Sequence, residues 1–289
     1  MKYIDDFINY LKVIKKDSNY TLDNYRKDLL ELNDFYSDLI NVKEVDVSNY
    51  LEYLYSRGLS RNSISRKLSS IRSFYNYLVR EDVIGVNYFK EVSNPKREDG
   101  LPKYVKSNDL EVMFNSFDMD NYLEQRNRLV LEMLYATGIR VSELVNIKIR
   151  DINKYDNTIK ILGKGSKERI VIYGSFCEDV MNKYLFDGRV KLDKNNSEYL
   201  FLNKNGDRLS DRYVREIINK VVKKCEVDYH ISPHTLRHTF ATDMLNAGAD
   251  LVSVKDLLGH SSLNTTSIYT HVSNSQIKKV YEFAHPRAK

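Results

Sequence analysis

Cysteine, proline and long apolar runs are scarce in this chain of 289 residues, and each scarcity excludes a class of protein. Its two cysteines, Cys177 and Cys225, lie far apart, so we expect two reduced thiols rather than a disulfide framework. No apolar run reaches the roughly 18 residues that a membrane span requires. The opening MKYIDDFINYL carries acids where a secretory signal carries basic residues, which predicts a cytoplasmic protein.

Charge is distributed unevenly, although the formal net charge is only +5. Residues 1–56 contain 7 Lys and Arg against 11 Asp and Glu, whereas residues 57–80 contain six basic residues and no acid. A block of one sign inside a balanced chain is typical of a surface that faces phosphates. An ordinary solvated helix face is the alternative, but such faces usually mix both signs.

Helical periodicity is clearest after Ser60. Apolar side chains recur there at steps of three and four, which predicts one buried stripe made of Ile64, Leu68, Ile71, Tyr75 and Leu78. The opposite face combines small hydroxyls with arginines, so a phosphate backbone could approach it closely. The residues that we expect to contact DNA on this face are Arg61, Ser65, Arg66, Ser69 and Arg72. Packing against other helices would explain the apolar stripe equally well, but not the missing acids.

The stretch 93–102 holds two of the four prolines and no periodicity, which predicts a linker at 95–103 between a helical domain at 1–94 and a mixed domain at 104–289. In the second domain, Ser107 is expected as a helix N-cap, and Gly138 as the end of a helix from Asn121. Runs of strand composition at 158–162 and 169–173 predict a β-hairpin around a glycine-rich turn. Further helices are expected at 175–186, 210–225, 233–247, 251–258 and 274–283. The fold class is therefore mainly α with a small antiparallel sheet.

A second basic stretch falls in the helix expected at 210–225. Arg212 and Arg215 are candidate DNA contacts, together with Lys220, although nearby Glu216 makes an ordinary solvated helix an equal alternative.

Four motifs in the second domain carry side chains suited to phosphoryl transfer: ATGIRVSEL at 136–144, GKGSKE at 163–168, HTLRH at 234–238, and LLGH at 257–260 followed by Tyr269. Arginines such as Arg140 and Arg237 offer planar donors to phosphate oxygens. Histidines can transfer protons near neutral pH, and a tyrosine hydroxyl becomes a nucleophile where cations favour the phenolate. Each residue has an ordinary alternative: Arg140 could simply pair with Glu143, and any one of 22 tyrosines could be a buried aromatic.

The other histidines are candidates for metal ligands or for surface residues. His230, His234 and His238 are spaced by four, but Pro233 interrupts the helix between the first two, and no metal site is expected. We expect His271 and His285 at the surface.

Taken together in order, Arg140, Lys164, His234, Arg237, His260 and Tyr269 resemble the catalytic set of the tyrosine recombinase (phage integrase-like) family. The ending AHPRA at 284–288 is similar to that of its Xer branch. The resemblance implies a SAM-like core-binding domain and a catalytic domain that clamp DNA, with a C-terminal helix exchanged between protomers. It assigns the scissile phosphate to Arg140 and Arg237, general acid to Lys164, acid/base assistance to His234, a phosphate hydrogen bond to His260, and the nucleophile to Tyr269.

The same resemblance implies metal- and ATP-independent strand exchange by a homo- or hetero-tetramer on double-stranded DNA, through a 3′-phosphotyrosyl link and a Holliday junction. It further implies a nucleoid-associated protein that resolves chromosome dimers at cell division, with a paralogous recombinase as a candidate partner and a DNA translocase as a candidate activator. Three alternatives stay open: an integrase of a phage or mobile element, a type IB topoisomerase, and an architectural DNA-binding protein without catalysis.

Overall fold

The computed structural model describes residues 1–17, 19–95, 104–163, 168–259 and 274–288. The chain divides into two compact units, Met1–Gly100 and Leu101–Lys289, and each has its own hydrophobic core. No helix in the described part of the chain is long and apolar enough to cross a membrane.

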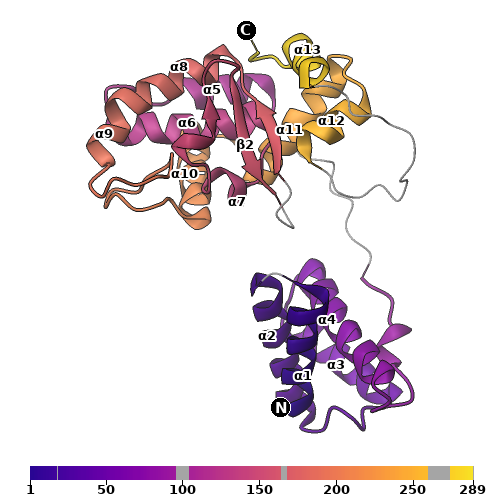
Figure 1. Ribbon diagram of the computed structural model, residues 1–289. Helices are drawn as coiled ribbons and strands as arrows, with labels where there is room; N and C mark the ends of the chain where they lie inside the picture. The colour runs from indigo at the N-terminus through magenta and orange to yellow at the C-terminus, as the bar shows by residue number, and fades with distance from the viewer. Residues whose placement is uncertain (18, 96–103, 164–167, 260–273, 289) are drawn as a thin grey trace. The chain divides into compact units, whose positions relative to one another are not determined.

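The first unit is helical (Figure 1). Its elements are α1 (Lys2–Tyr10), a π-helical turn (Leu11–Lys15), α2 (Asn19–Tyr36), α3 (Glu44–Ser56), α4 (Arg61–Arg80) and a 3₁₀ turn (Tyr88–Lys90). Helix α4 begins where the sequence predicts, because the Ser60 hydroxyl accepts a hydrogen bond from the backbone N–H of Ser63. All five residues of the expected apolar stripe are buried, so that prediction is confirmed.

The second unit is mainly helical with one small sheet. Its helices are α5 (Ser107–Asn115), α6 (Tyr122–Thr137), α7 (Val141–Leu144), α8 (Ser175–Lys183), α9 (Arg189–Leu192), α10 (Asp211–Lys224), α11 (Pro233–Asn246), α12 (Leu251–Leu258) and α13 (Asn274–Ala284). The expected helix from Asn121 is confirmed: the Asn121 side chain caps α6, and Gly138 ends it with φ +60°. Ser107 is not an N-cap, because Lys106 holds that position and Ser107 is already helical.

The predicted hairpin is present as β2 (Thr158–Leu162) paired antiparallel with β3 (Glu168–Ile172). A short strand β1 (Ile152–Asn153), which the sequence did not indicate, adds a third strand in the order β1-β2-β3. Two residues are too few to show an alternating pattern, which explains why β1 was missed. The fold class, mainly α with a small antiparallel sheet, is confirmed.

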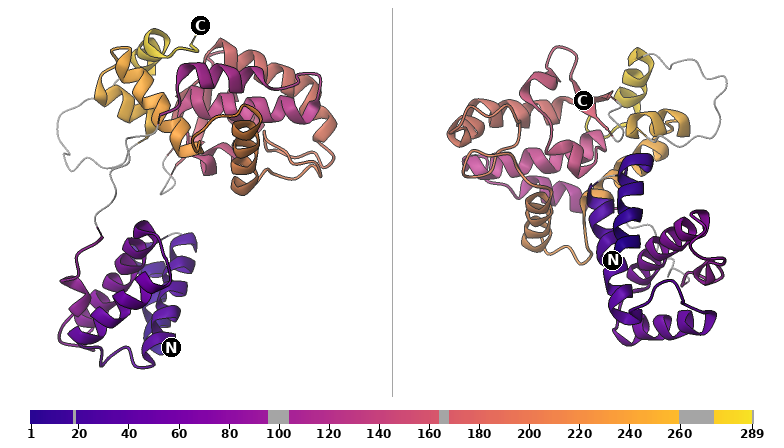
Figure 2. Two further views of the ribbon diagram at one scale, coloured as in Figure 1. Left: turned by 180° about the vertical axis from the view of Figure 1, so that it is seen from behind. Right: turned by 60° about the horizontal axis from the view of Figure 1, so that its bottom comes forward.

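Helices α11, α12 and α13 pack together beside the main core of the second unit (Figures 1 and 2). On α13, Tyr281 and Ala284 are buried against Phe240 and Leu257. The C-terminal helix therefore covers an apolar surface of its own chain, whereas the family resemblance implies that this helix is exchanged between protomers.

The expectation that His285 lies at the surface is wrong. Its side chain is buried and its ring stacks on Tyr281 at 4.9 Å between ring centroids. Burial of the imidazole lowers its pKa to about 3, and the positive charge of Arg287 adds a smaller effect in the same direction. A position near the end of the chain carries no information about burial when the terminal segment folds back onto the core.

Candidate active site

Arg140 lies in the turn that connects α6 to α7. Gly138 ends α6 in the left-handed conformation, and a Cβ there would lie only 2.7 Å from Phe240 Cδ1, so the turn requires glycine. Arg140 follows as the N-cap of α7. Its backbone N–H donates to Glu143 Oε2 at 2.8 Å, and its Nη1 donates to Glu143 Oε1 at 3.0 Å. The expected pair with Glu143 is therefore present, and it aims a guanidinium that stays 42% exposed.

Arg237 reaches this turn from α11. That helix begins at Pro233, as expected, and the Ser232 side chain caps it. Arg237 is buried; its Nη1 donates to the carbonyl of Gly138 at 2.5 Å, and its Nη2 donates to the carbonyl of Leu258 at 2.7 Å. The guanidinium thus joins the end of α6, 99 positions away in sequence, to the end of α12.

The two predicted arginines therefore belong to one cluster, which also contains Glu143 and Arg169. Arg169 Nη1 and Nη2 donate to the two Glu143 carboxylate oxygens at 2.9 and 2.8 Å. Burial alone would raise the pKa of the Glu143 carboxyl, but the hydrogen bonds from Arg169 and Arg140 outweigh this effect and lower it. Glu143 is therefore an anion that orients two guanidinium groups.

Positive charge exceeds negative charge in this cluster of four described residues. Three guanidinium groups face one carboxylate, a net of 3 − 1 = +2. Burial, and then the neighbouring charges of Arg140 and Arg169, lower the pKa of Arg237 to about 10. A phosphodiester placed here would relieve this repulsion, because its non-bridging oxygens accept hydrogen bonds from guanidinium groups.

The other predicted catalytic residues are only partly described. His234 lies on α11 three positions before Arg237, and its side chain is exposed. Lys164, His260 and Tyr269 lie outside the described residues. The structure thus brings Arg140 and Arg237 together and leaves the remaining assignments as predictions.

Sequence reasoning missed the part played by Arg169 and gave Glu143 only an ion pair. Glu143 carried a signal, since it stands inside the ATGIRVSEL motif. Arg169 carried none, because a charged residue at a strand end is usually solvated. No group of three or more His, Cys, Asp or Glu suited to a metal ion occurs among the described residues. His230 and His238 are both exposed.

We name the predicted DNA-contact face of the first unit the Ser/Arg face (Arg61, Ser65, Arg66, Ser69 and Arg72). All of these residues except Arg61 line a hollow beside α4. This part of the sequence contains no acid, and the acidic partners of Arg66 and Lys67 lie on α2. Asp28 is buried and accepts hydrogen bonds from Arg66, from Lys67 at 3.2 Å and from the Ser70 hydroxyl at 2.9 Å. Packing between helices therefore uses part of this positive charge, while the Arg66 side chain remains 48% exposed.

Arg72 is held by the segment that leaves the first unit. It donates to the carbonyls of Phe89 at 2.9 Å and Val92 at 2.5 Å, and to Asn94 Oδ1 at 2.9 Å. This arginine therefore fixes the path of the chain beside the Ser/Arg face, in addition to its predicted contact with DNA.

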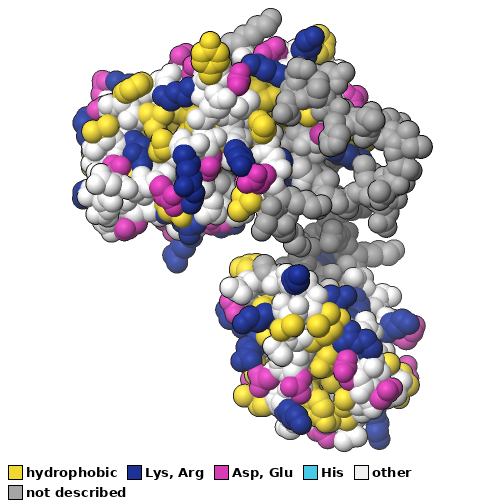
Figure 3. Space-filling model, viewed as in Figure 1, with side chains coloured by type: hydrophobic (Ala, Val, Ile, Leu, Met, Phe, Trp, Pro, Cys, Tyr) yellow, Lys and Arg dark blue, Asp and Glu magenta, His cyan; other side chains and the backbone are white. Residues whose placement is uncertain are grey.

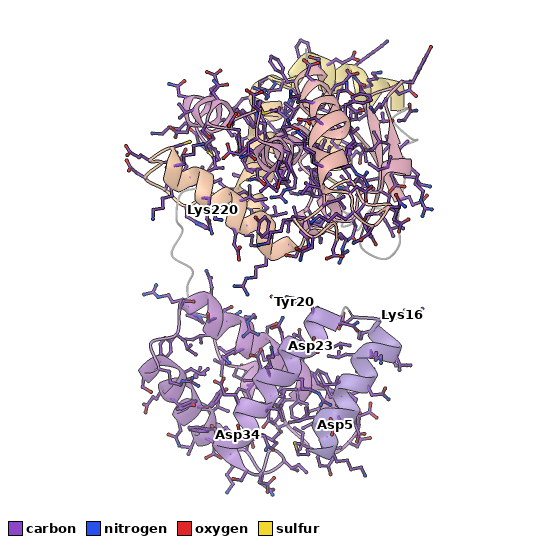
Figure 4. All side chains as sticks on the ribbon, turned by 90° about the vertical axis from the view of Figure 1, so that its left-hand side faces the viewer. Asp5, Lys16, Tyr20, Asp23, Asp34 and Lys220 are labelled. Carbon is purple, nitrogen blue, oxygen red and sulfur yellow. The ribbon has the colours of Figure 1, made fainter. Side chains whose placement is uncertain are left out.

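On α10 of the second unit, Arg212 pairs with Glu216 at 3.1 Å, and Arg215 is exposed. Lys220 is also exposed on this helix (Figure 4). Basic and acidic side chains are interspersed over the face of the molecule seen in Figure 3. Neither observation separates a phosphate-binding helix from a solvated one, so Arg212 and Arg215 stay predictions.

Comparison with known proteins gives consistent matches. The profile of the phage integrase family matches residues 103–276, and that of the phage integrase N-terminal SAM-like domain matches residues 4–82. Tyrosine recombinase XerC of Staphylococcus saprophyticus is 47% identical over 287 residues, covering 98% of this chain and 97% of the relative. Tyrosine recombinase XerC of Staphylococcus aureus is 45% identical over 294 residues, covering 100% of this chain and 98% of the relative. The solved structure of XerH site-specific recombinase bound to palindromic difH substrate, a post-cleavage complex, matches with a TM-score of 0.72 and 25% identity, covering 96% of this chain and 84% of that one.

Proposed function

The chain belongs to the phage integrase family of tyrosine recombinases, enzymes that cut and rejoin DNA, and we propose that it is the Xer-type recombinase that resolves chromosome dimers at cell division. Full-length similarity to tyrosine recombinase XerC at 45–47% identity supports this role over that of a phage or mobile-element integrase. The enzyme binds DNA recombination sites, and we place its action at the nucleoid in the cytoplasm.

The observation that carries the proposal is the guanidinium cluster around Glu143. In the proposed reaction, Arg140 and Arg237 donate to the non-bridging oxygens of the scissile phosphate and stabilise the charge that develops in the transition state. The Tyr269 hydroxyl loses its proton, with His234 as the assisting base, and its oxygen attacks phosphorus, so that an O–P bond to the 3′ strand end forms. The bond from phosphorus to the 5′ oxygen breaks, and Lys164 donates a proton to that oxygen.

Rejoining reverses these steps. The 5′ hydroxyl of a partner strand attacks the phosphotyrosyl ester, and the phenol leaves. One phosphate ester is exchanged for another in each step, so the reaction consumes no ATP, and the guanidinium groups supply the charge neutralisation that a metal ion supplies elsewhere. His234 assists proton transfer, and His260 donates a hydrogen bond to the phosphate.

Strand exchange between two sites requires four active sites, so we propose a tetramer on DNA, assembled from this chain alone or together with a paralogue. The resemblance assigns exchange between protomers to the C-terminal helix. In the described chain α13 packs on α11 and α12 of its own unit. We propose that this packing is exchanged for the equivalent surface of a neighbour on DNA, and that a DNA translocase activates the assembly.

Trapping the covalent intermediate tests the reaction. Nicked duplexes carrying candidate sites would be incubated with the full chain, and a protein–DNA adduct that survives denaturation is expected. Mapping of the adduct peptide should identify Tyr269, and Tyr269→Phe should form no adduct while still binding DNA. An adduct at another residue would reject the assigned nucleophile, and failure to form any adduct would favour an architectural protein. Relaxation of supercoiled DNA without a specific site would favour a topoisomerase.

A further inference from the structure

Arg169 makes contacts in the second unit that a merely structural arginine would not need. It is the second residue of β3, five positions after Lys164 in the sequence. Its guanidinium binds both oxygens of Glu143, the carboxylate that also holds the backbone and side chain of Arg140. Each Glu143 oxygen thus accepts one bond from Arg169 and one from Arg140, which leaves the carboxylate little freedom to rotate.

The same side chain covers the end of α12. Gly259 ends this helix with φ +64°, and a Cβ placed there would lie 2.7 Å from Arg169 Cδ and 2.8 Å from its Nε. The Arg169 side chain therefore lies directly against the Gly259 backbone, immediately before His260 in sequence. Arg237 donates to the carbonyl of Leu258, the residue before Gly259. The end of α12 thus contacts two arginines of the cluster.

Arg189 is a useful comparison, because it is an equally buried arginine whose hydrogen bonds are more complete. The two side chains are similarly buried, with 15% and 13% exposed. In Arg189 all three guanidinium nitrogens donate: Nε to the Tyr199 carbonyl at 3.2 Å, Nη1 to Asp193 at 2.9 Å, and Nη2 to the Ser197 and Tyr199 carbonyls. Arg169 Nε is also buried, but it has no acceptor within the described residues. A buried donor without an acceptor costs stability, and such sites call for an explanation other than stability.

We propose that Arg169 is a positioning residue for the cleavage reaction, which ties the strand after the Lys164 turn and the helix end before His260 to the carboxylate that orients Arg140. This inference rests on the proposed function. Arg169 lies on β3, contacts the end of α12 and binds Glu143, and each of these described parts is near an assigned catalytic residue in sequence. Loss of the guanidinium therefore lets them move relative to the scissile phosphate. A displacement of about 1 Å from reacting geometry costs about 100-fold in rate.

The expected signature is a slower chemical step with unchanged DNA affinity, because Arg169 directs its donors to Glu143 rather than to solvent. The test uses the full chain and a nicked duplex that the wild-type protein has been shown to cleave. Arg169→Gln should lower the single-turnover rate of covalent adduct formation about 100-fold at saturating protein, with the Kd for DNA within about 3-fold of wild type. Arg169→Lys retains the charge and one bond to Glu143, and should cleave at an intermediate rate.

Arg189→Gln is the matched control, since it removes an equally buried arginine of the same unit. It should lower the melting temperature at least as much as Arg169→Gln and leave the cleavage rate within about 3-fold of wild type. If Arg169→Gln and Arg169→Lys cleave at the wild-type rate, or if Arg189→Gln slows cleavage equally, the positioning role is wrong. A wild-type protein that cleaves no nicked duplex would instead reject the proposed function.

Discussion

Arg287, near the end of the chain, forms an ion pair with Glu132 in the middle of α6, 155 positions earlier. Glu132 is fully buried and also accepts a bond from Arg128 at 2.6 Å. The Arg287 guanidinium lies 4.3 Å from the ring centres of both Phe114 and Phe176. The terminal segment is therefore part of the core of the second unit.

Arg287→Ala should consequently destabilise the protein by about 3 kcal/mol, because a buried carboxylate would lose one of its two cationic partners. Urea unfolding followed by circular dichroism measures the change. Arg212→Ala is the control, since that side chain is 90% exposed and its pair with Glu216 contributes about 0.5 kcal/mol or less. Equal unfolding midpoints for Arg287→Ala and wild type would show that the tail is not held by this ion pair.

Buried His285 predicts a stability that depends on pH. Burial lowers its pKa from 6.5 to about 3, so between these values the unfolded chain binds a proton that the folded chain does not. As far as His285 is concerned, the folded state is therefore most stable above pH 6.5, where the ring is neutral in both the folded and the unfolded chain. Its free energy of unfolding falls as the pH drops below that value. Between pH 6.5 and 5.5 the loss should be about 1 kcal/mol.

His285→Phe keeps an aromatic ring in the stack with Tyr281 and removes the titration, so this part of the pH slope should disappear. His238→Gln alters an exposed histidine and should retain the slope. Urea midpoints at the two pH values report the difference. A wild-type slope in His285→Phe would assign the pH dependence to other groups.

Arg237→Lys should slow adduct formation by at least roughly 100-fold, since a single ammonium cannot reproduce the two directed bonds to Gly138 and Leu258 and also contact phosphate. Single-turnover cleavage of a nicked duplex is the measurement. Arg126→Lys alters another buried arginine, which donates to the Leu202 carbonyl at 2.9 Å, and should affect stability but not cleavage. Comparable rates for Arg237→Lys and wild type would place the phosphate elsewhere.

Ser69→Asp tests the Ser/Arg face. The exposed Ser69 lies on α4 beside Arg66 and Arg72, and a carboxylate there should repel the DNA backbone and lower affinity about 10-fold. The dependence of log Kd on log salt should become less steep by about one unit. Ser56→Asp, an exposed position at the end of α3, should bind DNA as wild type does. Equal affinities for the two variants would remove this face from the DNA interface.

Local signals in the sequence predicted α4, α6, α8, α10, α11, α12, α13 and the hairpin, but not the short helix α9. Ser60, Asn121 and Ser232 cap helices because their side chains satisfy backbone donors a few residues away, which is a short-range effect. The domain limits 1–94 and 104–289 and the roles of Lys164, His260 and Tyr269 remain predictions. The surface position expected for His285 was wrong because burial depends on contacts that lie far apart in sequence.

The sequence by itself determined the fold class and the family, and it predicted the order of the candidate catalytic residues, because motifs and helical periodicity depend on local sequence. Only the tertiary structure decided how these residues are held. In the folded chain, Asp28 pairs with basic side chains of α4, and Glu143 binds both Arg140 and Arg169. His285 is buried, and Arg287 pairs with the buried Glu132. Such partners are selected by distance in space, since electrostatic interactions and desolvation act between neighbouring atoms irrespective of their separation in the chain.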